Sequence, residues 1–146
     1  MDGNLIYLIQ TDTIAGFLSK NEKRLREIKK RSLKKPFLIN ACDFKTLKTL
    51  SRVPKKFKKR VRREKKATFI YKNSKAVRVV FDKDFYNFLK RFKWLYSTSA
   101  NRSGEKFEIN FALENADIIV EDKRGFNSSS PSKIYKISNN RIKKIR

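Results

Sequence analysis

The sequence of 146 residues contains no histidine and a single cysteine, Cys42. Without histidine the chain lacks the commonest general base and metal ligand, which excludes a Ser-His triad and a zinc site of the usual type. One cysteine excludes an intramolecular disulfide. Because Cys42 directly follows the segment 38–41, we expect a buried structural thiol in a reducing compartment.

Acidic residues are also scarce, since 14 Asp and Glu stand against 38 Lys and Arg and leave a net charge of +24. Such a charge favours polyanionic partners, above all nucleic acid. The alternative is a lysine-rich proteome in which basic residues only solvate the surface. No apolar run approaches membrane-spanning length, so we expect a cytoplasmic protein with no membrane partner.

The residues that are present predict one folded α/β domain over 1–146. Hydrophobic residues make up 39% of the chain and aromatic residues 12%, which argues against general disorder. Leu5 to Ile9 form a near-continuous apolar run, as expected of a strand buried on both faces of a parallel or mixed sheet.

Apolar periodicity and capping residues predict the other elements. A capping box from Ser19 to Glu22 opens a helix that runs to about Lys30 and brings Lys29 and Arg31 toward the sheet. A second helix, capped by Asp43, carries Phe44, Leu47 and Leu50, and a third carries Phe85, Phe88, Leu89 and Phe92, which we expect in the core. Further strands are expected at 37–39, 67–71, 76–81, 117–120, 133–137 and 141–145, and a flexible loop at Gly125–Pro131.

Residues 55–66 hold nine basic side chains and one acid. Val53, Phe57 and Val61 are spaced four apart, which predicts a basic helix with one apolar stripe. We expect this helix to bind RNA phosphates through Lys55, Lys56, Lys59 and Arg63.

Hydroxyl and amide side chains gather in the stretch Tyr96–Glu105. Directly behind the apolar Trp94 and Leu95, the stretch resembles a strand end that opens into an anion-binding turn. The alternative is an ordinary Ser/Asn turn.

Four segments carry a resemblance to a known family: Thr11–Phe17, Ile28–Pro36, Ala76–Val79 and Thr98–Gly104. In this order they resemble the P-T-[DE]-T-V-Y-G-L, K-x-R-x-x-x-K-P-L, A-V-R-V-P and T-S-A-N-x-S-G patterns of the YrdC-like threonylcarbamoyl-AMP synthases. The resemblance extends from about Leu5 to Arg146. It implies the YrdC-like fold, a twisted mixed sheet of parallel and antiparallel strands with flanking helices.

The family joins L-threonine, bicarbonate and ATP into threonylcarbamoyl-AMP and pyrophosphate for the threonylcarbamoyladenosine modification of tRNA. This reaction needs no protein nucleophile, because the protein supplies positioning and positive charge around the phosphates. The resemblance implies Mg²⁺ that arrives with ATP, no protein-only metal site, and tRNA and other tRNA-modification proteins as partners.

The resemblance also assigns roles residue by residue. The implied ATP ligands are Lys29, Arg31, Lys35, Ser99, Asn101 and Arg146, and of these Lys29, Arg31, Ser99 and Asn101 are the implied catalytic residues. The implied threonine ligands are Thr11, Thr13, Asn40, Arg78, Ser97 and Ser132. Without the resemblance, Lys29, Arg31 and Lys35 would be interpreted as part of a solvated basic face. Arg78 would be either simply exposed or held in a cleft.

Four departures from the family patterns leave other readings open. Gln10 replaces a proline, Ala15 a tyrosine, Asn40 a histidine, and residues 64–66 a Pro-Gly-Pro. These losses affect threonine selection more than nucleotide binding. One alternative is a non-catalytic relative that binds tRNA or double-stranded RNA in the basic cleft. Another is a different carbamoyl-adenylate chemistry on the same fold.

Overall fold

The computed structural model describes residues 1–127 and 130–146. The strands are β1 (Tyr7–Gln10), β2 (Ala15–Ser19), β3 (Leu38–Ala41), β4 (Ala67–Ile70), β5 (Ala76–Val79), β6 (Trp94–Ser99), β7 (Ile118–Val120), β8 (Lys133–Ile137) and β9 (Ile142–Lys144). The helices are α1 (Glu22–Lys29), α2 (Phe44–Leu50), α3 (Lys58–Arg63), α4 (Lys83–Leu89) and α5 (Ile109–Asn115), and a 3₁₀ turn, η1 (Lys55–Phe57), precedes α3.

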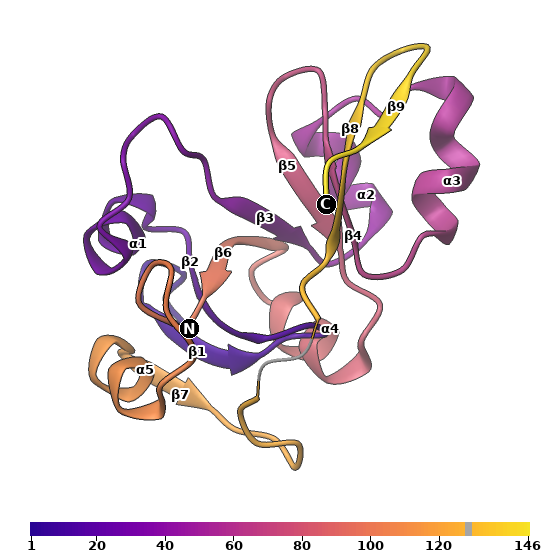
Figure 1. Cartoon of the computed structure of the whole chain (residues 1–146). Helices are drawn as coiled ribbons and strands as arrows, with labels where there is room; N and C mark the ends of the chain where they lie inside the picture. The colour runs from indigo at the N-terminus through magenta and orange to yellow at the C-terminus, as the bar shows by residue number, and fades with distance from the viewer. Residues whose placement is uncertain (128–129) are drawn as a thin grey trace.

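All the described strands belong to one sheet, in the order β7-β1-β2-β6-β3-β5-β4-β8-β9 (Figure 1). Three neighbouring pairs, β1–β7, β3–β5 and β4–β8, are parallel, and the other pairs are antiparallel. The expected twisted mixed sheet with flanking helices is therefore confirmed.

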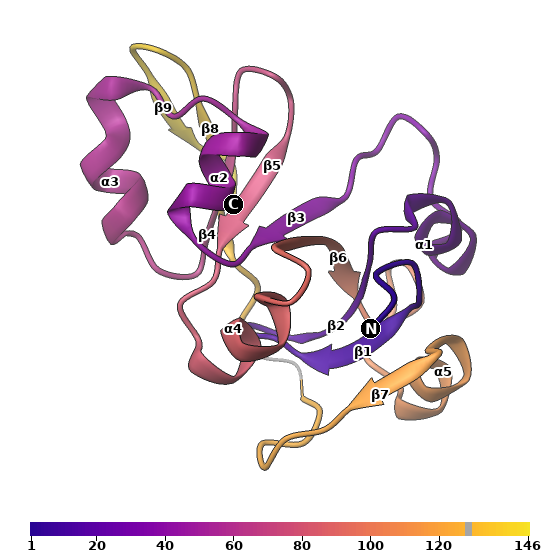
Figure 2. The ribbon, with the colours of Figure 1, turned by 180° about the vertical axis from the view of Figure 1, so that it is seen from behind.

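Side-chain alternation gives the β3–β5–β4–β8 part of the sheet one covered and one open face. Ile39 and Val77 point into a core cluster that Leu47 of α2 and Val61 of α3 complete. Figure 2 shows α2 in front of β4 and β5 with α3 beside it, and in the opposite view of Figure 1 these strands lie in front of α2. The intervening residues, such as Arg78, therefore face the open side.

Strand β1 is buried on both faces, as the apolar run predicts, although it spans Tyr7–Gln10 rather than Leu5–Ile9. Tyr7 and Ile9 pack with the side chains of α4, and Leu8 packs in the cluster that contains residues of α1 and α5. This double coverage fixes the end of β1, where the Thr11–Ile14 turn begins.

The second and third predicted helices are confirmed. Asp43 accepts a hydrogen bond from Thr46 N at 2.7 Å and caps α2. The four apolar residues expected in the third helix, Phe85, Phe88, Leu89 and Phe92, are all buried, although α4 ends at Leu89 and Phe92 follows it. Cys42 is also buried, 3% exposed, with its thiol 3.5 Å from the Thr46 hydroxyl.

The structure differs from the sequence analysis at three places. Strand β2, which follows the turn after β1 and ends at Ser19, was not expected. The cap of α1 is Asn21, which accepts from Arg24 N at 3.1 Å, because the Ser19 hydroxyl instead accepts from Asn21 N. The basic helix ends at Arg63 rather than Lys66, since Glu64 already has extended backbone.

Helix α5 is an element that the sequence analysis did not expect. Part of the expected flexible loop, Ser128 and Ser129, lies outside the described residues. Within the described ranges, no helix has the length and apolar character needed to cross a membrane.

Candidate functional site

A cavity of about 410 Å³ opens on the open face, above the middle of the sheet. Its walls come from distant parts of the chain: the β1–β2 turn, the approach to β3, strands β4, β5 and β6, the start of β8, and Arg146. The bordering residues are Thr11, Thr13, Ile14, Gly16, Arg31, Pro36, Leu38, Thr68, Ile70, Ala76, Arg78, Ser97, Thr98, Ser99, Pro131, Ser132, Ile134 and Arg146.

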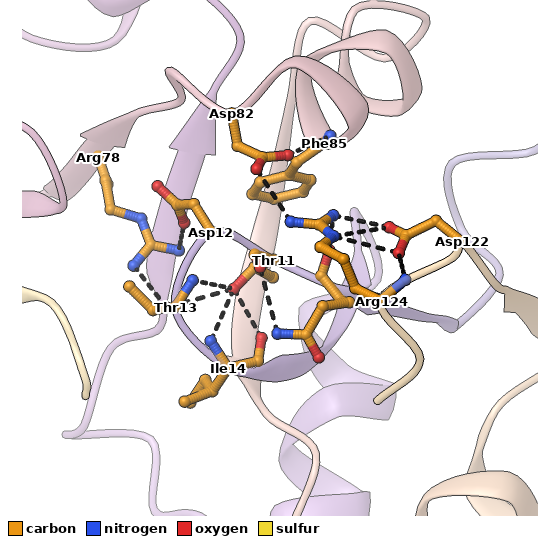
Figure 3. Close-up of polar contacts among 10 residues, drawn as sticks. Thr11, Asp12, Thr13, Ile14, Arg78, Asp82, Phe85, Asp122 and Arg124 are labelled. Atoms are coloured by element: carbon orange, nitrogen blue, oxygen red, sulfur yellow. Dashed lines mark hydrogen bonds and ion pairs between the residues drawn. The ribbon is translucent and has the colours of Figure 1, made fainter. Parts of the chain in front are cut away.

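Arg78 is the most buried of the three arginines that border the cavity, with 3% of its surface exposed. Its Nε donates to Asn40 Oδ1 at 3.1 Å. Its Nη1 donates to Thr13 Oγ1 at 3.2 Å, and its Nη2 lies 3.1 Å from Asp12 Oδ1 (Figure 3). Burial lowers the pKa of Arg78, the Asp12 charge opposes this, and Arg146 adds to it. The guanidinium is thereby held in one orientation with its charge largely retained.

The turn that carries Asp12 and Thr13 is fixed by its own first residue. The Thr11 hydroxyl donates to Ile14 O at 2.6 Å and accepts from the backbone N–H groups of Thr13 and Ile14 (Figure 3). Such a hydroxyl-centred turn needs no glycine and keeps its threonine side chains rigid.

Gln10, which replaces the family proline, ties this turn to the segment after β7. Its Oε1 accepts from Asn127 N at 2.9 Å, and Asn127 O accepts from Ala15 N at 3.0 Å. Arg124 adds a second tie, since it pairs with Asp122 and Asp82 and donates to Gln10 O at 3.3 Å (Figure 3). The cavity wall is thus anchored where the family pattern is broken.

The far wall is held by Ser132, which is 4% exposed. Its hydroxyl lies 2.9 Å from the Thr68 hydroxyl, and its carbonyl oxygen accepts from Nε and Nη2 of Arg146 at 3.2 and 3.0 Å. Arg146 is therefore presented to the cavity by a backbone contact. Across from it, Arg31 stacks on the Phe37 ring at 4.6 Å and donates to Pro36 O.

Lys29 lies behind the cavity wall rather than in it. Its buried Nζ donates to Ser99 O at 2.9 Å, to Asn101 Oδ1 at 3.1 Å and to Asn101 O, and Ser103 Oγ donates back to Lys29 O at 2.8 Å. Lys29 thereby fastens the Ser99–Ser103 turn to the end of α1. Burial and, secondarily, the Arg31 charge lower the pKa of Lys29 to about 8.

This shift predicts a pH-dependent stability. Because the pKa of Lys29 is lower in the folded than in the unfolded chain, the unfolded chain binds more protons above pH 8, and stability rises as the pH goes from about 8 toward 10.5. Over that range the wild type should gain about 2 kcal/mol more unfolding free energy than Lys29→Met. Urea unfolding at several pH values measures this difference.

Lys23→Met is the matched control, since Lys23 is exposed on the same helix. It should follow the wild-type pH dependence. If Lys29→Met also follows it, then Lys29 has an ordinary pKa and the stated shift is wrong.

Of the twelve residues that the sequence analysis assigned to ATP and threonine, eight border the cavity: Thr11, Thr13, Arg31, Arg78, Ser97, Ser99, Ser132 and Arg146. The other four do not border it. Lys29 and Asn101 hold the turn behind the wall, Asn40 supports Arg78, and Lys35 is exposed. The expected RNA ligands Lys55, Lys56, Lys59 and Arg63 are exposed at η1 and α3, on the opposite face of the sheet.

Three polar residues of the site were not predicted: Asp12, Thr68 and Thr98. Asp12 was the one acid inside the Thr11–Phe17 motif, and an acid in an otherwise neutral turn signals a basic partner. Thr68 is the polar residue between Ala67 and Phe69, which alternation places on the cavity face.

Positive charge and hydroxyl groups dominate the site. Arg31, Arg78 and Arg146 border the cavity, and Asp12 pairs with Arg78. In the described part of the chain, no three His, Cys, Asp or Glu side chains gather as a metal site would require. The geometry therefore defines an α/β domain with a cationic pocket suited to anionic ligands.

The chain belongs to the Sua5_yciO_yrdC family, whose model, described as "Telomere recombination", matches residues 2–146. No curated protein gives a significant match to the sequence.

Solved structures share the fold. The crystal structure of P. abyssi Sua5 complexed with L-threonine matches with a TM-score of 0.82 and 17% identity, over 97% of this chain and 50% of that chain. E. coli YciO matches with a TM-score of 0.79 and 18% identity, over 98% and 82%. The solution structure of MTH1692 from Methanobacterium thermoautotrophicum matches with a TM-score of 0.71 and 21% identity, over 99% of this chain and 80% of that chain. The chain thus spans about half the length of the P. abyssi Sua5 chain.

Proposed function

We propose that this chain is a threonylcarbamoyl-AMP synthase that acts in the cytoplasm. The observation that carries the proposal is the cavity itself, in which Arg31, Arg78 and Arg146 meet the hydroxyl groups of the motif residues. The threonine bound to P. abyssi Sua5, on the same fold, supports threonine as the amino acid.

In the proposed reaction, threonine carbamate formed from threonine and bicarbonate attacks the α-phosphorus of ATP. The new bond joins a carbamate oxygen to that phosphorus, the bond to the β-phosphate breaks, and pyrophosphate leaves. Mg²⁺ enters with ATP as part of the substrate. The protein contributes orientation and compensating charge.

Each basic residue of the cavity has a distinct part. The planar fork of Arg78 is fixed by Asn40, Thr13 and Asp12 and suits the threonine carboxylate. Arg31 and Arg146 lie on other walls of the same cavity and offset phosphate charge. Lys29 and Asn101 act by holding the Ser99 turn in place.

The proposal predicts pyrophosphate release that depends on ATP, bicarbonate and threonine together. The assay offers each common amino acid in turn to the folded protein, with an active family member measured alongside. Threonine should give the largest stimulation. Absence of threonine-stimulated release, with the reference enzyme active, would refute the proposed activity.

RNA binding is a second candidate function, favoured by the exposed basic side chains of η1 and α3 on the face away from the cavity. Neutralising Lys55, Lys56, Lys59 and Arg63 to glutamine should reduce the slope of log affinity against log salt by about 3 for single-stranded RNA. Filter binding at several salt concentrations measures the slope.

Pyrophosphate release should stay nearly unchanged in the same variant, because these residues do not border the cavity. An equal loss of both properties would show that α3 contributes to the active site.

A further inference from the structure

A second hollow of about 410 Å³ lies at the end of the sheet formed by β4, β8 and β9. Its border consists of Ile70, Tyr71, Lys72, Ser74, Lys136, Ile137, Ser138, Arg141 and Lys143. We call it the basic hollow. Ile70 also borders the candidate active site, so the two cavities are neighbours along β4.

The charge of the basic hollow is one-sided. Four of its bordering residues are basic, namely Lys72, Lys136, Arg141 and Lys143, and none is acidic. Among the described residues, no carboxylate forms an ion pair with any of the four. This contrasts with the nearby surface at Arg60, Glu64 and Lys133, where Glu64 pairs with both basic residues.

The strand register makes this arrangement unfavourable on its own. Lys136 of β8 is the direct partner of Lys143 of β9. Like charges directly opposite each other in an antiparallel pair destabilise the sheet. Arg141 lies in the turn between the same two strands, which adds to the repulsion. A bound anion would remove this repulsion.

We propose that the basic hollow binds a ligand that carries several phosphate groups along one chain. Its cations come from three segments, the β4–β5 turn, β8 and the β8–β9 hairpin, so one small anion would not contact all of them. Lysines act as point charges toward phosphates, and the volume lies within the range of small-molecule sites. Such phosphates belong either to a free polyphosphate compound or to an RNA backbone.

This site is separate from the proposed reaction, because it shares no basic residue with the active-site cavity. Its test therefore uses a local readout in place of turnover. Amide chemical shifts of Lys136 and Lys143 are followed by NMR while tripolyphosphate, and separately a single-stranded RNA oligonucleotide, are added without Mg²⁺. Both amides should shift with at least one probe.

Two variants with equal charge loss locate the binding. The hollow variant changes Lys72, Lys136 and Lys143 to glutamine, and the matched variant changes Lys23, Lys45 and Lys83, which are exposed and border neither cavity, to glutamine. The hollow variant should bind the effective probe about tenfold more weakly than the matched variant. Because neutralisation removes a like-charge pair, the hollow variant should remain folded, and Lys136→Gln alone gives the same direction of change.

The outcomes separate the two sources. Weakened binding of tripolyphosphate alone identifies a free polyphosphate ligand, and weakened binding of RNA identifies the phosphodiester backbone. The proposal is overturned if the Lys136 and Lys143 amides do not shift with either probe. It is equally overturned if the hollow and matched variants bind both probes alike.

Discussion

Replacing Arg78 with lysine is expected to lower threonine-dependent pyrophosphate release by about tenfold to a thousandfold. The guanidinium uses three nitrogens to contact Asn40, Thr13 and Asp12. A lysine ammonium keeps the charge but offers one nitrogen, so it can neither keep all three contacts nor present a two-pronged fork to a carboxylate. Initial rates with varied threonine measure the loss.

Arg52→Lys is the matched control, because Arg52 is exposed and does not border the cavity. RNA affinity and its salt dependence should stay the same in both variants, since neither changes the net charge. If Arg78→Lys keeps full turnover in a folded sample, Arg78 is not the carboxylate ligand, and the assignment based on the family pattern fails at this residue.

The second large effect concerns stability. Arg78→Met should lower the free energy of unfolding by about 3 to 5 kcal/mol, because it leaves the Asp12 carboxylate buried without its cation. The side chains of the pair are 3% and 5% exposed. In the double variant Asp12→Asn/Arg78→Met, part of this loss should be recovered, since the uncompensated charge is gone. Urea unfolding of the wild type, both single variants and the double variant gives the coupling energy.

Additive losses in this cycle would contradict a coupled pair. A loss below about 1 kcal/mol for Arg78→Met would show that Asp12 finds other compensation, such as water. In either case the pair would not be the reason for the fixed orientation of Arg78.

Much of the site follows from the sequence because strand alternation decides which residues face the cavity. Arg78, Ser97 and Ser132 lie in or beside strands β5, β6 and β8. The order of the motifs was enough to predict that they border one site. The sheet type and the core role of Phe85 and Phe88 likewise follow from local apolar patterns.

Residues that depend on contacts between distant segments were harder to place. Its position in a helix alone suggests that Lys29 is a surface cation. Only its contacts with Ser99 and Asn101, some 70 positions away, show that it holds the Ser99–Ser103 turn in place. Strand β2 contains Gly16, which weakens a strand signal, and α5 has no side-chain cap. The replacement Gln10 signals a lost proline in the sequence, but its contact with Asn127 depends on the folded chain.

The order of strands in the sheet has a consequence for how the cavity is assembled. β7 lies at one edge of the sheet, whereas β8, the next strand in the chain, pairs with β4 near the other edge. The cavity therefore joins the first hairpin to the last one, and we expect it to form only after these slow, non-local pairings are complete. A substrate that contacts Thr13, Arg78 and Ser132 together would link these distant segments and stabilise the whole fold. At a hundred times its Kd it would add about 2.7 kcal/mol to global stability, so resistance to proteolysis far from the cavity would report that the cavity is filled.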